Sequence, residues 1–198
     1  MRQSIIVTIW LVMMVSACSS NAPTKTQYYL LNSPTSTSTS TSTVSNENQQ
    51  NITVSLLELP DYLKQPSLVL QLSSHQLHYS HFHMWAEPLQ NSFSQALLDD
   101  LNQQDNRFNY IDNSTTTSKA SIEAITIKVS AFHATHQSQA LLTGTFWVQS
   151  SNTVKQPQPQ KFTLTLTLDK NGYEHAVEKM RQSINQLAQK IINNINVE

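Results

Sequence analysis

The sequence predicts an α+β fold, with a mainly antiparallel sheet of about six strands and two amphipathic helices packed on one face. Two patterns lead to this prediction. Short segments alternate apolar and polar residues, as half-buried strands do, and two longer segments repeat apolar residues at spacings of three and four, as helices do. Because a sheet and an amphipathic helix can each bury one apolar side against the other, two stacked layers satisfy both.

Short alternating segments indicate the strands. Residues 28–31 form an aromatic and aliphatic run that suits a first strand, and residues 52–56 alternate with period two. The segments 67–72 and 75–82 indicate a strand pair. The other predicted strands are a short one at 107–111 and longer ones at 121–132, 140–149 and 161–168.

The first predicted helix begins near Trp85. Glu87 and Pro88 suit its first turn, because a carboxylate there meets the positive end of the helix dipole and proline has no N–H to leave unpaired. A large aromatic side chain at the start of an apolar stripe usually packs into the core, so we interpret Trp85 as a core anchor rather than a platform for lipid. The stripe consists of Trp85, Leu89, Phe93, Ala96, Leu97 and Leu101.

The second predicted helix is longer and lies near the C-terminus. It follows residues 169–172, where Asp-Lys-Asn-Gly ends the last predicted strand. We interpret its apolar face as core-facing rather than as a cofactor site. That face consists of Tyr173, Val177, Met180, Ile184, Leu187, Ala188, Ile191 and Ile195.

The N-terminal segment predicts export and lipid attachment. Residues 5–15 form an apolar run behind Arg2 that is too short to cross a bilayer core of about 30 Å and is typical of a signal peptide. The segment ending in Ala17 and Cys18 resembles a bacterial lipobox. This resemblance implies cleavage between these two residues, with diacylglycerol on the cysteine sulfur and a further acyl chain on the new amino group. We therefore predict a signal peptide at 1–17, and the alternative is an ordinary signal peptide followed by a free cysteine.

One domain is predicted to follow. Residues 18–27 form a polar, lipidated tether, and its nine residues after the cysteine have an r.m.s. length on the order of 16 Å. The domain covers 28–198, since a chain of 198 residues has little room for two domains. Within it, 32–50 is rich in serine and threonine and lacks the apolar groups that offset the entropy of ordering, so we predict a disordered loop. Ser19, rather than aspartate, follows the cysteine, which in bacterial lipoproteins generally implies export to the outer membrane.

The composition argues against several classes of function. With a formal net charge of -1 and 13% charged residues, the chain has no basic surface for a nucleic-acid backbone. Its two glycines, Gly144 and Gly172, lie too far apart for a P-loop, a dinucleotide-binding motif or a nucleophile elbow. The single cysteine permits neither an internal disulfide nor a multi-cysteine zinc site. We therefore expect no enzymatic activity and no cofactor beyond the covalent lipid.

Four closely spaced histidines leave a metal site as an alternative. His75, His78, His81 and His83 fall within one short segment, and neutral imidazole is a common ligand of transition metals. On a regular strand, His75, His81 and His83 would share one face and His78 would lie on the other, so all four could not bind one ion. We favour a solvated strand face, because no ligand motif of standard spacing is present.

Several separated motifs together resemble a known family. Cys18 is followed by Tyr-Tyr-Leu-Leu at 28–31, Leu-Pro-Asp-Tyr-Leu at 59–63, Trp-Ala-Glu-Pro-Leu at 85–89, and a late strand at 141–148 before the last helix. In this order and spacing, they resemble the PqiC family of ABC-type transport auxiliary lipoproteins over nearly the whole mature chain. The segments at 59–63 and 85–89 are the most specific.

The resemblance implies a non-enzymatic role in lipid transport that supports membrane integrity. It implies a lipoprotein of the outer membrane that faces the periplasm, works with a PqiB-like MCE protein of an inner-membrane complex, and assembles into rings. Asp61 and Glu87 are first expected to stabilise a turn and a helix start, and secondly to contact a partner. The rival interpretation is a stand-alone periplasmic binding lipoprotein that binds metal through its histidines. The motif residues that are candidates for partner contact are Pro60, Asp61, Tyr62, Leu63, Trp85, Glu87 and Pro88.

Overall fold

The computed structural model describes five stretches of the chain. They are residues 25–32, 49–57, 59–113, 121–150 and 156–195. Ala17, Cys18 and the rest of the predicted signal peptide lie outside the described residues, as does most of the predicted loop at 32–50.

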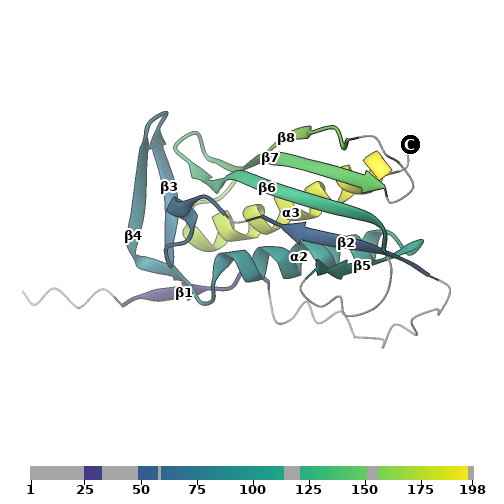
Figure 1. The fold of residues 1–198 in the computed structure, drawn as a ribbon. Coiled ribbons are helices and arrows are strands. Elements are labelled where there is room, and N and C mark those ends of the chain that lie inside the picture. The colour runs from purple at the N-terminus through teal and green to yellow at the C-terminus, as the bar shows by residue number, and fades with distance from the viewer. Residues whose placement is uncertain (1–24, 33–48, 58, 114–120, 151–155, 196–198) are drawn as a thin grey trace, which may run out of the picture.

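Eight strands, two α-helices and a 3-10 turn follow one another in the described stretches (Figure 1). Each predicted strand is confirmed, with ends that differ by a few residues. The elements are β1 (Gln27–Tyr29), β2 (Gln50–Leu56), η3 (Asp61–Leu63), β3 (Ser67–Ser73), β4 (Gln76–Trp85), α2 (Leu89–Gln104), β5 (Phe108–Asp112), β6 (Ser121–Thr135), β7 (Gln139–Ser150), β8 (Gln160–Thr167) and α3 (Tyr173–Ile195).

The start of α2 differs from the prediction. Trp85 ends β4 rather than opening the helix, and α2 begins at Leu89. The reason is Pro88, whose φ of -56° and ψ of 122° lie outside the helical region, and which also disfavours helical geometry in the residue before it. The spacing of Trp85 to the helical stripe was therefore misleading, although the prediction that its side chain is buried is confirmed.

The strands form one mixed sheet, so the prediction of a mainly antiparallel sheet of about six strands is wrong in both respects. The central strand, β6, pairs with β7 in antiparallel fashion over almost its whole length, and β7 pairs with β8. On its other edge, β6 pairs in parallel with two strands: β2 pairs with the first half of β6, and β3 pairs with the end of β6. The antiparallel pair of β3 with β4 and two further parallel pairs, β1 with β4 and β2 with β5, complete the sheet. Parallel neighbours need long crossovers, and alternation alone does not reveal which strands those crossovers join.

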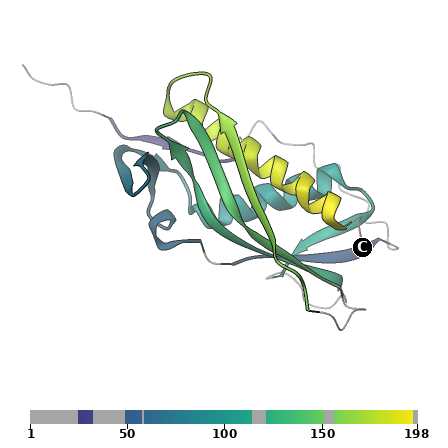
Figure 2. The same ribbon diagram turned by 90° about the horizontal axis from the view of Figure 1, so that it is seen from above.

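Both helices cover the same face of this sheet, as predicted (Figure 2). The helix α3 packs on β7 and β8, α2 packs on β5 and β2, and the two helices contact each other. Gly144 in β7 faces this layer, and any side chain there would collide with the Lys128 carbonyl oxygen and the Phe162 ring.

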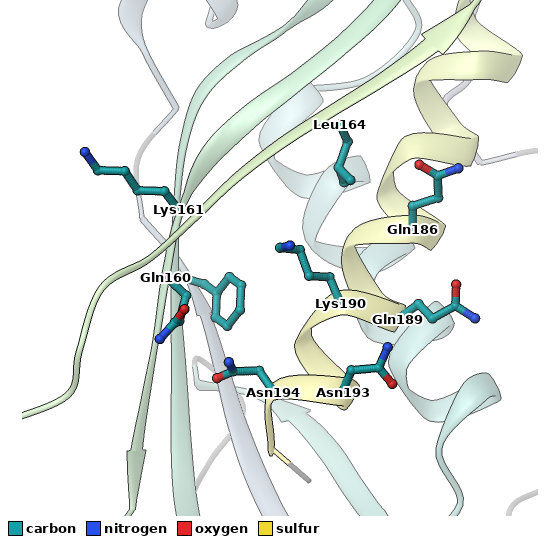
Figure 3. Close-up of a pocket in the computed structure, with 9 residues that line it drawn as sticks. Gln160, Lys161, Leu164, Gln186, Gln189, Lys190, Asn193 and Asn194 are labelled. Atoms are coloured by element: carbon teal, nitrogen blue, oxygen red, sulfur yellow. The ribbon is translucent and has the colours of Figure 1, made fainter. Parts of the chain in front are cut away.

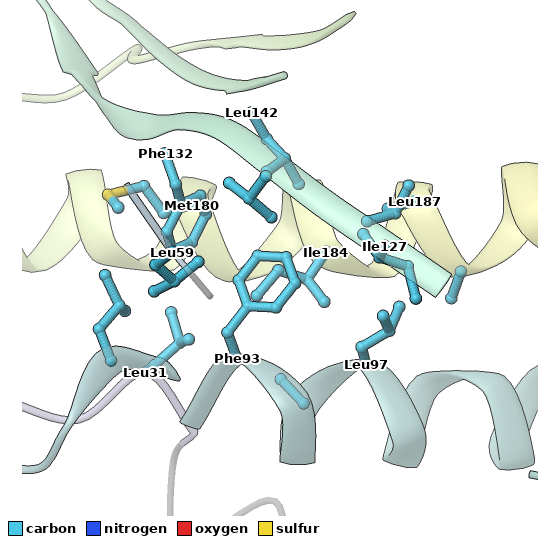
Figure 4. Packing of buried hydrophobic residues seen from close by; sticks show 14 of the residues in the cluster. Leu31, Leu59, Phe93, Leu97, Ile127, Phe132, Leu142, Met180, Ile184 and Leu187 are labelled. Carbon is cyan, nitrogen blue, oxygen red and sulfur yellow. The ribbon is translucent and has the colours of Figure 1, made fainter. Parts of the chain in front are cut away.

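The core lies between the helices and the sheet (Figure 4). Phe93 of α2 and Phe132 of β6 meet edge to face at its centre, with ring centroids 5.2 Å apart. A charged pair joins the two helices beside this core. Arg181 donates two hydrogen bonds, of 2.5 and 2.8 Å, to the two carboxylate oxygens of Asp100, whose residue is only 2% exposed. Such a bidentate pair fixes the relative position of α2 and α3.

Candidate functional site

The three motif segments meet at one end of the domain, although they are far apart in the sequence. The Ala86 amide donates a hydrogen bond of 2.9 Å to the Tyr29 carbonyl oxygen, which joins β1 to the residues before α2. The Leu59 amide donates one of 3.4 Å to the side-chain oxygen of Gln90 in α2. Figure 4 shows Leu31 and Leu59 close to Phe93 in the shared core. We refer to this part of the molecule as the motif end.

The Leu-Pro-Asp-Tyr-Leu motif forms a tight turn anchored by its leucines. The Leu63 amide donates a hydrogen bond of 2.8 Å to the Pro60 carbonyl oxygen, which closes η3. Leu59 and Leu63 are buried in the core, whereas Asp61 is exposed. The motif thus combines apolar anchors with an outward polar tip.

Asp61 does not cap this turn, contrary to the role first expected for it. The N-cap position of η3 is Pro60, and no side chain caps the turn. Asp61 instead forms an ion pair of 2.7 Å with Lys64. The hydrogen bond from Lys64 lowers the pKa of the Asp61 carboxyl below its ordinary value. Asp61 is therefore a negatively charged, accessible group at neutral pH.

Tyr62 connects the turn to the end of β6. Its hydroxyl donates a hydrogen bond of 3.3 Å to the Ser130 carbonyl oxygen, and its ring lies 5.9 Å from the His133 ring. Burial raises the pKa of Tyr62 to about 12. Burial likewise lowers the pKa of His133, which is therefore neutral at neutral pH. This contact makes Tyr62 chiefly a structural residue.

The Trp-Ala-Glu-Pro-Leu motif joins β4 to α2. Trp85 and Leu89 are buried, and the exposed residues between them are Ala86, Glu87 and Pro88. The Ser92 hydroxyl donates a hydrogen bond of 2.7 Å to a carboxylate oxygen of Glu87. The prediction that Glu87 and Pro88 lie in the first turn is wrong, because both precede α2 and no side chain caps it, but this contact still joins Glu87 to the start of the helix.

The four histidines of the sequence cluster do not converge on one point. His75 lies in the turn before β4, and the His78 and His81 rings meet edge to face with centroids 6.4 Å apart. His83 lies elsewhere, against Tyr29 and α3. Among the described residues, no group of three or more His, Cys, Asp or Glu side chains is placed to hold a metal ion. The expectation that His78 lies on the opposite face from His81 is wrong, because their rings are in contact and β4 has an irregularity between Tyr79 and Met84.

His83 fastens β1 to the body of the domain. Its ring stacks on Tyr173, the first residue of α3, with centroids 3.7 Å apart. Its Nδ1 atom lies 2.7 Å from the Tyr29 hydroxyl, within hydrogen-bonding distance. Burial is the main cause that raises the pKa of Tyr29. Sequence reasoning missed this three-ring contact, because the partners come from three distant segments.

The opposite end of the domain carries an open cleft between β8 and the last turns of α3 (Figure 3). It has a volume of about 470 Å³. Its polar side chains are amides and two lysines, and it offers no nucleophile with an adjacent general base. The lining residues are Phe146, Gln160, Lys161, Leu164, Gln186, Gln189, Lys190, Asn193 and Asn194.

The described part of the chain is an α+β scaffold with an open cleft at one end and the exposed motif residues at the other. None of its helices is long and apolar enough to cross a membrane. The most distinctive surface features lie at the motif end, where the charged tip of η3 and the exposed part of the β4–α2 junction project outward.

Comparison with known proteins defines the family. The family of ABC-type transport auxiliary lipoprotein components matches residues 29–192. The chain belongs to this family, as the sequence motifs predicted. No curated protein sequence matches it.

Two solved structures that match with TM-scores above 0.5 share the fold. A crystal structure of an uncharacterized protein matches with a TM-score of 0.70 and 21% identity, covering 86% of this chain and 99% of the other. A crystal structure of a protein from Xanthomonas campestris matches with a TM-score of 0.56 and 13% identity, covering 73% and 81%. A PelC dodecamer from Paraburkholderia phytofirmans matches with a TM-score of 0.40 and 9% identity, covering 70% and 86%.

Proposed function

We propose that this chain is a lipoprotein anchored through Cys18 in the outer membrane and facing the periplasm. There it serves as an auxiliary component of a PqiABC-like system that moves lipid between membranes and supports membrane integrity. The observation that carries the proposal is the family match over residues 29–192. The role is one of binding and positioning, and it includes no catalytic step and no cofactor beyond the covalent lipid.

The anchor accounts for how a water-exposed domain stays at a membrane. Each buried methylene contributes about 0.8 kcal/mol, and a single acyl chain binds only marginally, so two or three chains on Cys18 hold the protein durably. The tether between the cysteine and β1 is short. The motif end, where β1 enters the domain, therefore stays close to the bilayer.

The partner in this proposal is a PqiB-like MCE protein of an inner-membrane complex, bound by a ring of copies of this chain. Confinement to one leaflet raises the effective concentration of subunits for ring assembly and for capture of the partner. The structure narrows the candidate contact residues. Leu63 and Trp85 are buried, and Tyr62 is held against β6, so Asp61, Glu87 and Pro88 are the motif residues most accessible to a partner.

Co-purification tests this function. The full chain, affinity-tagged at its C-terminus, is isolated in mild detergent from cells that also produce the MCE protein. We expect the two proteins to elute together, with a mass by light scattering that corresponds to several copies of this chain. Asp61→Arg is expected to reduce the recovery of the MCE protein, whereas Asp99→Arg makes the same charge change on an exposed position of α2 and should not. A monomeric chain without the MCE protein would contradict the proposal.

A further inference from the structure

The hairpin of β3 and β4 has an unusual surface for a domain in water. Residues 67–86 contain no Asp, Glu, Lys or Arg, and the nearest charged residues are Lys64 and Glu87. Large apolar side chains on this hairpin and on the adjacent β1 are nevertheless exposed. Tyr28 is 66% exposed, Phe82 43% and Tyr79 39%.

Strand register places Tyr28 and Phe82 on one face of the sheet. Tyr28 of β1 is the partner of Met84 in β4, and directly paired residues project to the same side of a sheet. Alternation back from Met84 puts Phe82 on this side as well. The register of β3 with β4 shifts between Ser67, which pairs with Met84, and Val69, which pairs with Tyr79, so this pairing does not place Tyr79 on the same face. We call the surface formed by Tyr28, Phe82 and Met84 the aromatic face.

The aromatic face points away from the helices. The residues that alternate with it, Tyr29, His83 and Trp85, lie on the other side, where His83 stacks on Tyr173 of α3 and Trp85 is buried. The helix layer therefore cannot cover the aromatic side chains. Among the described residues, no other strand of the sheet lies beyond β1, which pairs only with β4.

On the side of the sheet that faces away from the helices, the composition of β8 differs from that of the hairpin. Its exposed residues are threonines and one lysine, namely Lys161, Thr163, Thr165 and Thr167. The large exposed apolar residues are thus concentrated toward the motif end rather than spread along the sheet. Tyrosine is enriched at the level of lipid headgroups, where its ring is partly in hydrocarbon and its hydroxyl stays hydrated.

The position of the tether indicates what contacts the aromatic face. Tyr28 lies ten positions after Cys18, and even a fully extended chain of that length spans at most about 36 Å. Figure 1 shows β1 at the same end of the molecule as the hairpin of β3 and β4. Resting on the proposed acylation of Cys18, this geometry keeps the aromatic face within reach of the headgroups at all times. The hairpin carries no ionised carboxylate, ammonium or guanidinium group whose desolvation would oppose contact.

We propose that the aromatic face of β1 and β4 inserts at the headgroup level of the bilayer that holds the lipid anchor. The protein is then attached at two points, the acylated cysteine and the aromatic face, and its orientation is fixed. The cleft between β8 and α3, at the other end of the domain, is directed away from the membrane.

Fluorescence quenching by brominated lipid tests the contact. The mature lipoprotein carrying Phe82→Trp is reconstituted on vesicles of phosphatidylethanolamine and phosphatidylglycerol whose acyl chains are brominated near the glycerol end. Thr165→Trp, an exposed position on β8, is the matched control, and the wild-type chain gives the background emission of its own tryptophans. We expect a loss and a blue shift of emission for Phe82→Trp on the vesicles, and neither for Thr165→Trp.

Equal quenching at both positions, or no quenching at position 82, would overturn the inference. In particular, absence of quenching together with poorer recovery of the MCE protein for Phe82→Ser would assign the face to a protein partner. Circular dichroism establishes that each variant is folded. Whether Cys18 is acylated is measured separately, from the mass of the N-terminal peptide. If Cys18 proves unmodified, vesicles added to the free protein still report whether position 82 reaches lipid.

Discussion

The body of the domain and its hairpin end differ in where their charged and large apolar side chains lie. In the body, formed by the helices on β6 to β8, the buried carboxylate of Asp100 is paired with Arg181. At the hairpin end, formed by β1, β3 and β4, the strands contain no Asp, Glu, Lys or Arg and large apolar side chains face outward. Because the hairpin end also contributes Leu68 and Trp85 to the core, the difference lies in its outer surface, which we infer is shaped for contact with something outside the chain.

The largest effect is expected in the core of the body. Leu97 is 1% exposed on the inner side of α2, so Leu97→Asp would bury an unpaired carboxylate. We expect the domain to lose its cooperative thermal transition, monitored by circular dichroism. Gln103→Asp, on the exposed side of the same helix, should unfold nearly as the wild type does. A normal transition for Leu97→Asp would remove α2 from the core.

The next largest effect concerns the ion pair between the helices. Arg181→Ala leaves Asp100 buried without its partner, and we expect a loss of about 3–5 kcal/mol in the free energy of unfolding. Replacing both residues, with Asp100→Leu and Arg181→Met, should recover most of this loss, because no charge then remains buried. Chemical denaturation measures both. Equal destabilisation by the single and double variants would show that side-chain packing, rather than the charge, matters there.

A smaller, pH-dependent effect is expected at the end of α2. Hydrogen bonds from Arg107 lower the pKa of the buried Asp105, and Tyr110 also donates to it. A carboxyl with a lowered pKa in the folded state stabilises above its unfolded pKa of about 4 and loses that contribution as the pH falls through the folded value. Asp105→Asn should therefore cost about 1–3 kcal/mol at neutral pH.

The difference between wild type and Asp105→Asn should shrink as the pH is lowered below about 4. Denaturant titrations over a series of pH values measure it. A difference that is constant with pH would contradict the assigned pairing with Arg107.

The smallest effect on stability is expected at the hairpin end. Phe82→Ser and Tyr28→Ser remove exposed side chains, and such surface changes usually alter stability by no more than about 0.5 kcal/mol. Thermal unfolding of the two variants in detergent should match that of the wild type. Strong destabilisation of either would show that the aromatic side chains support the body after all, and would erase the contrast between the two regions.

The sequence allowed the elements to be predicted better than their arrangement. Alternation and helical spacing located the eight strands and both helices, because these periods reflect local geometry and a one-sided core. The parallel pairing of β2 and β3 with β6 was not predictable in this way, since a period does not identify a neighbouring strand. The prediction that the helix begins at Trp85 was wrong for a different reason: this residue of β4 happens to lie at helical spacing from the apolar residues of α2.

The candidate site was predictable only in part. The motif segments were found by resemblance, and the structure shows why they belong together, since they share hydrogen bonds and a core at one end. The contact of His83 with Tyr29 and Tyr173 joins three distant segments, so no local spacing indicates it. The aromatic face could have been suspected from the lack of charge in residues 67–86, but its common orientation required the register of β1 and β4.

The most direct test of the account is the mass of the mature N-terminus. The protein is extracted from its native membranes and its N-terminal peptide is analysed by mass spectrometry. We predict that the first residue is Cys18, that it carries diacylglycerol and a further acyl chain, and that the protein fractionates with the outer membrane. A free thiol on Cys18, in a chain recovered from the soluble periplasmic fraction, would contradict the account.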